Sequence, residues 1–314
     1  MTKYIIKKII TSLLVMLGVS ILTFGMGRLA PGDPVDTVLA GTQNPTAEEI
    51  ASARAYLGLD EPIVSQYFKW LSRALSGDLG LSFQTGQPVS HELAVRLPQT
   101  MILTLGSVIV MLVIAFPLGI ISALHRGHFS DYTIRFFNVL AISVPSFCIG
   151  ILLILVLGVK HKWLPVMGNG SIKHLIMPSL AIGIGTGAGL ARLIRSQILT
   201  HMEAEHVTAA RVFGVKSSTI LKNHVLKNAI PPIITNIGLM IGGMLGGSAI
   251  IETLFSWQGA GSYAVQAIYA RDYPVIQAYA LVMAVIYITI NILIELSYFV
   301  TVPSVYLLGG RDGK

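Results

Sequence analysis

The chain has 314 residues, of which 53% are hydrophobic and 12% are charged, and its mean hydropathy is +0.71. Because soluble globular proteins carry roughly 25% charged residues, this composition excludes an ordinary soluble enzyme and indicates an integral membrane protein. The formal net charge of +7 does not indicate nucleic-acid binding, because the sequence has no clustered basic stripe with interleaved aromatic residues.

Six apolar segments approach the ~20 residues that a helix needs to cross a bilayer. The first follows three lysines, as a signal peptide would, but its apolar run is too long and no small-residue cleavage site follows it. We therefore interpret it as a membrane span. The six predicted spans are residues 5–26, 100–123, 136–159, 175–190, 230–251 and 276–300.

The segment between the first two spans, residues 29–98, is the only sizeable water-exposed part of the sequence. Thr46 and Glu49 form a capping box that predicts a helix reaching about Tyr56. A second helix is predicted to start at Pro62, where proline fits the first helical turn, and to end at Gly77. Counted from Arg28, the segment has a net charge of −3. It is too small for a large core of its own, so we expect it to lean on the membrane body or on a partner; a plain connector is the alternative.

The basic residues predict the orientation. With the amino terminus inside, the cytoplasmic segments hold 13 of the 22 Lys and Arg residues. Both termini are therefore predicted to be cytoplasmic, although the outward-facing segment 160–173 carries three lysines against this trend.

The fourth span contains four glycines between residues 183 and 189, which weaken a helix but permit close helix packing. The single cysteine, Cys148, lies in an apolar span, so no intramolecular disulfide is possible.

The cytoplasmic segment between the fourth and fifth spans has the composition of a helical hairpin. Residues 203–213 favour a helix, and Gly214 can adopt the left-handed conformation that ends one. Ser217 or Ser218 can cap a second helix, which Pro231 and Pro232 are predicted to stop. The lysines of that helix, Lys222 and Lys227, are predicted to face water.

This segment resembles the coupling loop of ABC-importer permeases of the dipeptide, oligopeptide and nickel class, and specifically their larger, B-type subunit. Further motifs appear in the order typical of that family and extend the resemblance over residues 28–277. They are Arg28 to Pro34 (RLAPGDP), Leu57 to Asp60, Gln66-Tyr67 with Trp70-Leu71, Gly77 to Gly80, Pro117 to Gly119, Ser143 to Pro145, Glu252 with Phe255, Trp257 and Gly259, and Asp272 to Pro274. Each motif is weak alone, but the ordered set is specific.

The sequence also departs from the family pattern at three places. Glu205-His206-Val207 stands where Asp-Tyr-Val is usual, and Gln258 replaces a common proline. The Asp-Pro-Arg that usually follows the last span is absent. These differences affect local loop details and not the family assignment.

The resemblance implies an all-α membrane protein with six transmembrane helices. The expected parts are an amino-terminal helix (1–28), an extracytoplasmic lobe (29–98), a five-helix core (99–302) that includes the coupling loop (191–229), and a cytoplasmic tail (303–314). The implied location is a bacterial-type inner membrane. The implied partners are the lipid bilayer, a homologous second permease, two ATPase subunits that bind ATP and Mg, and an extracytoplasmic binding protein. This chain itself is expected to hold no cofactor, and no nucleic acid is expected to bind it.

Two groups of residues are predicted to carry the transport function. The coupling group is Ala209, Ala210, Arg211 and Gly214: glycine for the elbow, alanines for close packing, arginine for a charged or carbonyl partner. The second group lies on the glycine-rich fifth span and is predicted to line the translocation path, with simple helix packing as an equal alternative. Its members are Gly238, Gly242, Gly243, Gly246 and Ser248.

Rival functions find less support in the sequence. It contains no phosphate-binding loop, no HExxH motif and no G-x-S-x-G elbow, so we expect no catalytic residues and no enzyme activity. Histidines at 125, 128, 161 and 174 are not expected to bind metal. An ion-coupled secondary transporter would need carboxylates inside the membrane, and Glu295 is the only one predicted well within a span, with Glu252 at an outer end. That transporter and a non-transporting scaffold remain as alternatives. Peptides and nickel, free or chelated, are nearly equal alternatives for the cargo, although residues 272–277 look somewhat more like the nickel members of the family.

Overall fold

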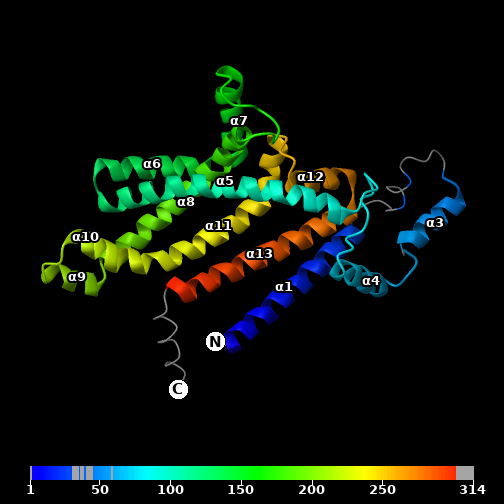
Figure 1. Cartoon of the computed structure of the whole chain (residues 1–314), viewed down its shortest axis with the longest axis horizontal. Helices are drawn as coiled ribbons and strands as arrows, with labels where there is room; N and C mark the ends of the chain where they lie inside the picture. Colours follow the sequence, from blue (N-terminus) through cyan, green and yellow to red (C-terminus); the bar gives the residue numbers. More distant parts are fainter. Residues whose placement is uncertain (1, 30–34, 36–38, 40–44, 58, 302–314) are drawn as a thin grey trace. The chain divides into compact units, whose positions relative to one another are not determined.

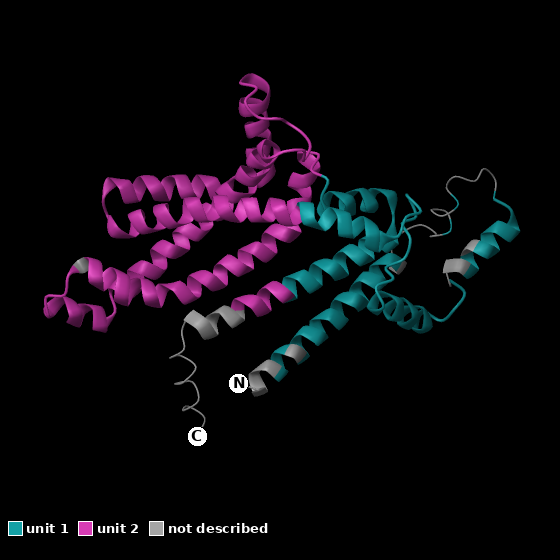
Figure 2. Cartoon of the chain, in the orientation of Figure 1, with its two compact units in different colours: residues 1–99, 258–288 teal, residues 100–257, 289–314 magenta. Residues whose placement is uncertain are grey.

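The computed structural model describes residues 2–29, 35, 39, 45–57 and 59–301. In these residues the named elements are all helices, and the only strand-like pairing is an isolated bridge between Leu81 and Pro88 (Figure 1). The chain divides into two compact units, residues 1–99 with 258–288 and residues 100–257 with 289–314 (Figure 2). Two of the three boundaries fall inside long helices, α5 (Val89–Leu124) and α13 (Tyr273–Thr301), and the third lies between residues 257 and 258. The motif Arg28 to Pro34 lies mostly outside the described residues.

Unit 1 contains α1 (Thr2–Leu29), α3 (Ala47–Leu57), α4 (Ile63–Leu75), α12 (Ala260–Ala270) and the beginnings of α5 and α13. Its core joins the start of α5 to α12 and α13 through Val89, Leu93, Tyr263 and Val275. The turn before α5 is tied to the α12–α13 junction, because the Ser82 hydroxyl donates a 2.6 Å hydrogen bond to the buried Asp272 carboxylate.

Both helices predicted for the outer segment are confirmed. The Thr46 backbone N–H and hydroxyl donate to Glu49 Oε2 at 2.8 and 2.9 Å, and Glu49 N–H donates back to the Thr46 hydroxyl. These bonds lower the pKa of Glu49. The second helix, α4, begins one residue later than predicted, because Pro62 is extended and occupies the capping position. Its last helical residue is Leu75, and the predicted glycine follows two residues later at Gly77, whose φ of +86° lets the chain reverse.

Unit 2 contains α6 (Phe129–Ser143), α7 (Ser146–Leu153), η1 (Ile154–Lys160), α8 (Ile172–Met202), α9 (Glu205–Val212), α10 (Ser217–Ile220), η2 (Leu221–Leu226), α11 (Lys227–Leu254) and most of α5. The two η segments are π-helical. The unit has one large apolar core in which α8 is central, contributing Met177, Leu190 and Ile194.

Five of the described helices are long and apolar enough to cross a membrane, and a bent pair supplies a sixth span if it is counted as one. The bent pair is the predicted third span. It is not one straight helix, because α6 and the following α7–η1 segment meet at 97°. Pro145 cannot donate a backbone hydrogen bond and holds Val144 extended, with ψ of 123°, so the helix breaks there.

The predicted fourth span is shorter than the helix that forms. Helix α8 continues past residue 190 to Met202 and includes Arg192 and Arg195. The sequence predicted close helix packing at its glycines, and two of them, Gly183 and Gly187, pack against α5. A Cβ at Gly183 would lie 2.5 Å from Val110 Cγ1, and one at Gly187 would lie 3.0 Å from Ile114 Cβ. Gly119 of α5 makes the reciprocal approach to Ile194. The spacing of small residues by four therefore lets the two backbones meet closely.

This seam gives a first testable prediction. Gly183→Val should destabilise the protein by about 1–3 kcal/mol, because the added atoms overlap a packed neighbouring helix. Gly189→Ala is the matched control on the same helix, since its Cβ would meet only Met240 Cε at 3.7 Å. The thermal unfolding midpoint in detergent should fall for the first variant and stay near that of the parent for the second. Equal midpoints would contradict the close packing.

Candidate functional site

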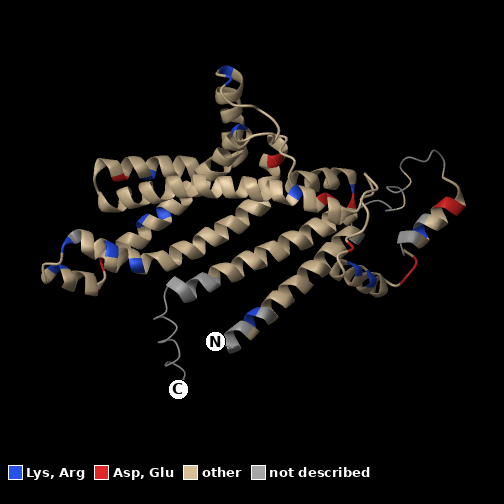
Figure 3. Cartoon of the chain, in the orientation of Figure 1, with Lys and Arg blue, Asp and Glu red and all other residues tan. Residues whose placement is uncertain are grey.

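The segment between α8 and α11 forms a compact projection of unit 2. Figure 3 shows Lys and Arg residues along the last part of α8, on α9, in η2 and at the start of α11. Helix α9 begins at Glu205, two residues after the predicted start, because α8 ends at Met202 and Ala204 is extended. It ends just before a turn at Gly214, which confirms the predicted glycine elbow: its φ is +76°.

Two backbone hydrogen bonds close this elbow. Gly214 N–H donates to the carbonyl of Arg211 at 3.0 Å, and Val215 N–H donates to the carbonyl of Ala210 at 3.1 Å. This pairing is a Schellman motif, which requires a left-handed residue at the position of Gly214. No atom outside the neighbouring residues lies within 4 Å of where a Cβ would be, so the glycine is required by its backbone conformation and not by lack of space.

The elbow exposes apolar side chains that the sequence analysis did not select. Val212 is 80% exposed and Phe213 is 85% exposed, whereas Val207 and Val225 on the inner side are fully buried. Ala209 and Arg211 are exposed, and Ala210 is half-buried against the core. The sequence did contain a sign of this exposure: two large apolar residues directly precede a glycine at which the chain reverses. A turn leaves little protein nearby to cover such side chains.

Ion pairs hold the base of this projection. Arg126, in the turn between α5 and α6, pairs with Glu203 at the end of α8. Nearby in sequence, Asp131 is almost fully buried and receives a bidentate pair of 2.8 Å bonds from Arg195. The Ser122 hydroxyl and Gly127 N–H complete its coordination at 2.6 and 3.1 Å. One carboxylate therefore joins α5, α6 and α8, and the sequence analysis missed it because no local motif marks Asp131.

The second helix of the projection differs from the prediction in how it starts and ends. Its first backbone bonds are accepted by the carbonyl of Lys216, so the helix begins directly at Ser217. It does not stop at Pro231 and Pro232, because both lie inside α11. Wide π-helical turns in η2 precede them, and the Asn228 side-chain amide donates 2.8 Å to the carbonyl of His224. Local adjustments of this kind let a membrane helix continue through proline. Lys222 and Lys227 are exposed, as predicted.

The predicted path residues on α11 fall into two environments. Gly243 and Gly246 lie on an exposed face, and nothing lies within 4 Å of where their Cβ atoms would be. Gly242 is half-buried. Gly238, in contrast, is buried where a side chain would overlap Ile294 of α13, and Ser248 is fully buried. The open face is therefore centred on Gly243 and Gly246.

Ser248 belongs to a buried polar cluster near the end of α11. Its hydroxyl and that of Thr100 on α5 lie 3.0 and 2.8 Å from Glu252 Oε1. Glu252 lies near the end of α11 and is fully buried in unit 2, a burial that the sequence analysis did not predict. The side chain of Glu295 lies outside the described part of the chain.

The histidines do not converge on one point. The His125 and His128 rings are perpendicular with centroids 6.2 Å apart, and His206 and His224 lie 6.3 Å apart in the projection. Among the described residues no group of three or more His, Cys, Asp or Glu side chains has the arrangement of a metal site.

Comparison with known proteins finds similarity over nearly the whole chain. The sequence pattern of a family described as "binding-protein-dependent transport system inner membrane component" matches residues 115–305, and the pattern of its N-terminal region matches residues 1–104. The chain is 36% identical to the glutathione transport system permease protein GsiC of Escherichia coli O6:H1, over 97% of this chain and 99% of that protein. It is 35% identical to the oligopeptide transport system permease protein AppB of Bacillus subtilis, with the same coverage.

A second prediction follows from the elbow. Gly214→Val should raise the free energy of the closed turn by about 1–2 kcal/mol, because a branched side chain is disfavoured at positive φ. That cost corresponds to a factor of about 5–30 in the population of the open loop. Trypsin should therefore cleave after Arg211 and Lys216 about 5–30-fold faster in this variant. Gly214→Asn is the control, since asparagine tolerates the left-handed conformation; equal cleavage of both variants would contradict the assignment.

Proposed function

The chain belongs to the family of binding-protein-dependent transport system inner membrane components, and from this premise we propose that it is the pore-forming permease subunit of an ATP-driven importer of peptides. The observation that carries the cargo class is the near full-length similarity to permeases for glutathione and for oligopeptides. Glutathione is itself a tripeptide, so both relatives move short peptides. This similarity favours peptides over nickel, between which the residues alone did not decide.

The projection at Gly214 is proposed to dock on an ATPase subunit. Val212 and Phe213 are the apolar anchors, and burying a side chain of this size stabilises a complex by about 1.5–3 kcal/mol. Ala209 permits close approach of the partner, and Arg211 can pair with a carboxylate or carbonyl at the rim. ATP and Mg would be bound by two such ATPase subunits and not by this chain.

Movement of the docked projection would reach the membrane through its base. The Arg126–Glu203 pair links the end of α8 to the turn after α5, and Asp131 with Arg195 fastens α6 to α8. Removing one partner from a buried ion pair typically costs 3–5 kcal/mol. These helices are therefore expected to move as one body when the ATPases close, which is the mechanical requirement of alternating access.

The open glycine face of α11 is proposed to lie along the translocation path, beside a homologous second permease. Gly242, Gly243 and Gly246 leave space for a peptide backbone or for a sliding partner helix. Gly238 and Ser248 support this face from behind, through contacts with Ile294 and Glu252. An extracytoplasmic binding protein would deliver the cargo.

The docking step gives a third prediction. Phe213→Asp should lower recovery of the ATPase subunits with the purified permease, and uptake with it, because a charge replaces an apolar anchor that must be desolvated. Phe213→Leu, which keeps an apolar side chain, should retain most of both. The amount of permease in the membrane should be equal for the two variants. Undiminished ATPase recovery with Phe213→Asp would contradict the docking role.

Topology and cargo are tested together in reconstituted vesicles. With Cys148 replaced by serine, single cysteines at Ser76 and Ser218, both exposed, should react with an impermeant reagent from the outside and the inside respectively.

The complete complex with its binding protein should import labelled glutathione or a labelled oligopeptide only when ATP is supplied. Uptake driven by an ion gradient without ATP, or uptake of nickel alone, would contradict the proposed function.

A further inference from the structure

Helix α4 is strongly divided into three faces, and the first packs on the membrane span α1. The Tyr67 hydroxyl lies 2.8 Å from the Ser20 hydroxyl. The Phe24 ring contacts the rings of Tyr67 and Trp70, with centroids 5.5 and 5.6 Å apart. Both helices belong to unit 1 (Figure 2). These contacts fix α4 against the last part of α1.

The second face of α4 is apolar and uncovered. Val64, Phe68 and Leu75 are 66%, 61% and 81% exposed, and the half-buried Leu71 lies between them on the same face. The spacing of four, three and four residues places all of them in one stripe along the helix. No charged residue interrupts the stripe.

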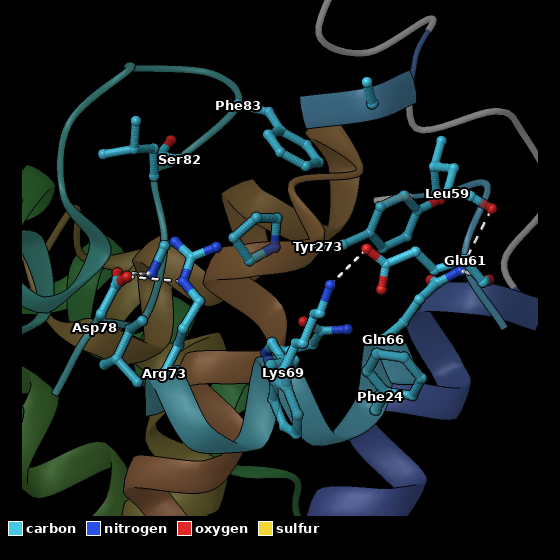
Figure 4. Close-up of a pocket in the computed structure, with 18 of the residues that line it drawn as sticks. Phe24, Leu59, Glu61, Gln66, Lys69, Arg73, Asp78, Ser82, Phe83 and Tyr273 are labelled. Atoms are coloured by element: carbon cyan, nitrogen blue, oxygen red, sulfur yellow. Dashed lines mark hydrogen bonds and ion pairs between the residues drawn. The ribbon is translucent and has the colours of Figure 1, made fainter. Parts of the chain in front are cut away.

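The third face is polar and lines a cavity of about 590 Å³. Figure 4 shows Gln66, Lys69 and Arg73 of α4 at this cavity. Lys69 pairs with Glu61 at 2.5 Å and Arg73 with Asp78 at 2.8 Å. These bonds lower the pKa of both carboxyl groups. Because the charges lie on this side, the apolar stripe does not point to the same aqueous space.

The depth of α4 along α1 can be estimated. The apolar stretch of α1 is Ile6–Gly27, and the residues that contact α4, Ser20 and Phe24, precede its end by three to seven positions. At 1.5 Å per residue this is about 5–10 Å. Helices that lie in the plane of a membrane bury their apolar face about 5–10 Å into the boundary between headgroups and acyl chains. On α1 itself, Leu22 and Met26 are 67% and 63% exposed at the same level.

We propose that α4 is an in-plane membrane helix whose stripe, Val64, Phe68, Leu71 and Leu75, is inserted into the lipid leaflet where α1 ends. Because α4 contacts α1 within the apolar stretch of α1, the stripe lies at the level of the acyl chains, which is why lipid is favoured over a soluble partner. Tyr67 and Trp70 then lie at the depth where aromatic side chains are enriched. In the proposed topology this is the outer leaflet, and α4 anchors the extracytoplasmic lobe at a fixed height.

The test uses the full complex in vesicles of phosphatidylethanolamine and phosphatidylglycerol. Single cysteines replace Phe68, Leu75 or Arg73 in a background with Cys148 changed to serine, and each carries a fluorescent label. Arg73 is the control, since it is exposed on the polar face of the same helix. Lipids brominated on the acyl chains should quench most of the emission at positions 68 and 75 and little at 73. Aqueous iodide should show the reverse order.

Two results would overturn the inference. Strong iodide quenching at 68 and 75 would place the stripe in water, and protection from both quenchers would mean that another protein covers it. Neither measurement uses cargo or ATP, so the outcome is independent of the proposed transport function. The cysteine at Ser76 separately reports on which side of the membrane the lobe lies.

As a second variant, Phe68→Asp with Leu75→Asp should release the lobe from lipid and accelerate its cleavage by protease in vesicles, whereas Arg73→Asp on the polar face should not. Equal cleavage of the double variant and the control would also count against lipid insertion.

Discussion

A chain in lipid must satisfy its own backbone hydrogen bonds, because the hydrocarbon offers no water to replace a missing partner. This constraint explains why the described elements of the chain are helical and why its irregularities take the forms they do. At Pro145 the helix breaks sharply. At Pro231 and Pro232 it instead continues, with π-helical turns in η2 and the Asn228 side chain bonded to a nearby carbonyl. The same residue type therefore produces a bend in one span and a continuous helix in another.

The polar groups inside unit 2 obey the same rule by different means. Asp131 receives four hydrogen bonds, two from Arg195 and one each from the Ser122 hydroxyl and the Gly127 N–H. Both of its carboxylate oxygens therefore have donors although the side chain is buried. Glu252 is held by two hydroxyl groups from α5 and α11. Between these two clusters α5 and α8 meet through glycines, with no polar contact required. The polar contacts lie near the projection and near the end of α11, and small-residue packing lies between them. This arrangement suits helices that move together as a rigid body.

Features encoded locally were predictable from the sequence. The Thr46–Glu49 box and the glycines at 77 and 214 each specify a helix end within a few residues, and all three were confirmed. The class of protein followed from apolar length. The contacts that the sequence did not predict join residues distant in sequence. Asp131 and Arg195 are 64 positions apart, and the Thr100 hydroxyl that contacts the buried Glu252 is 152 positions from it. The exposure of Val212 and Phe213 was also missed, since hydrophobicity alone predicts burial. A side chain is buried only where a neighbouring element of the fold packs over it.

The elbow at Gly214 has a kinetic consequence. Its two closing bonds lie between Ala210 and Val215, so they require no contact with distant parts of the chain. Closing so short a loop takes about 10–100 ns, whereas assembly of the spans depends on segments that are synthesised later. The turn that presents Val212 and Phe213 can thus be complete as soon as it leaves the ribosome, before α11 and α13 enter the membrane. For the proposed docking on an ATPase subunit, the order of synthesis favours a surface that is ready before the later spans have assembled.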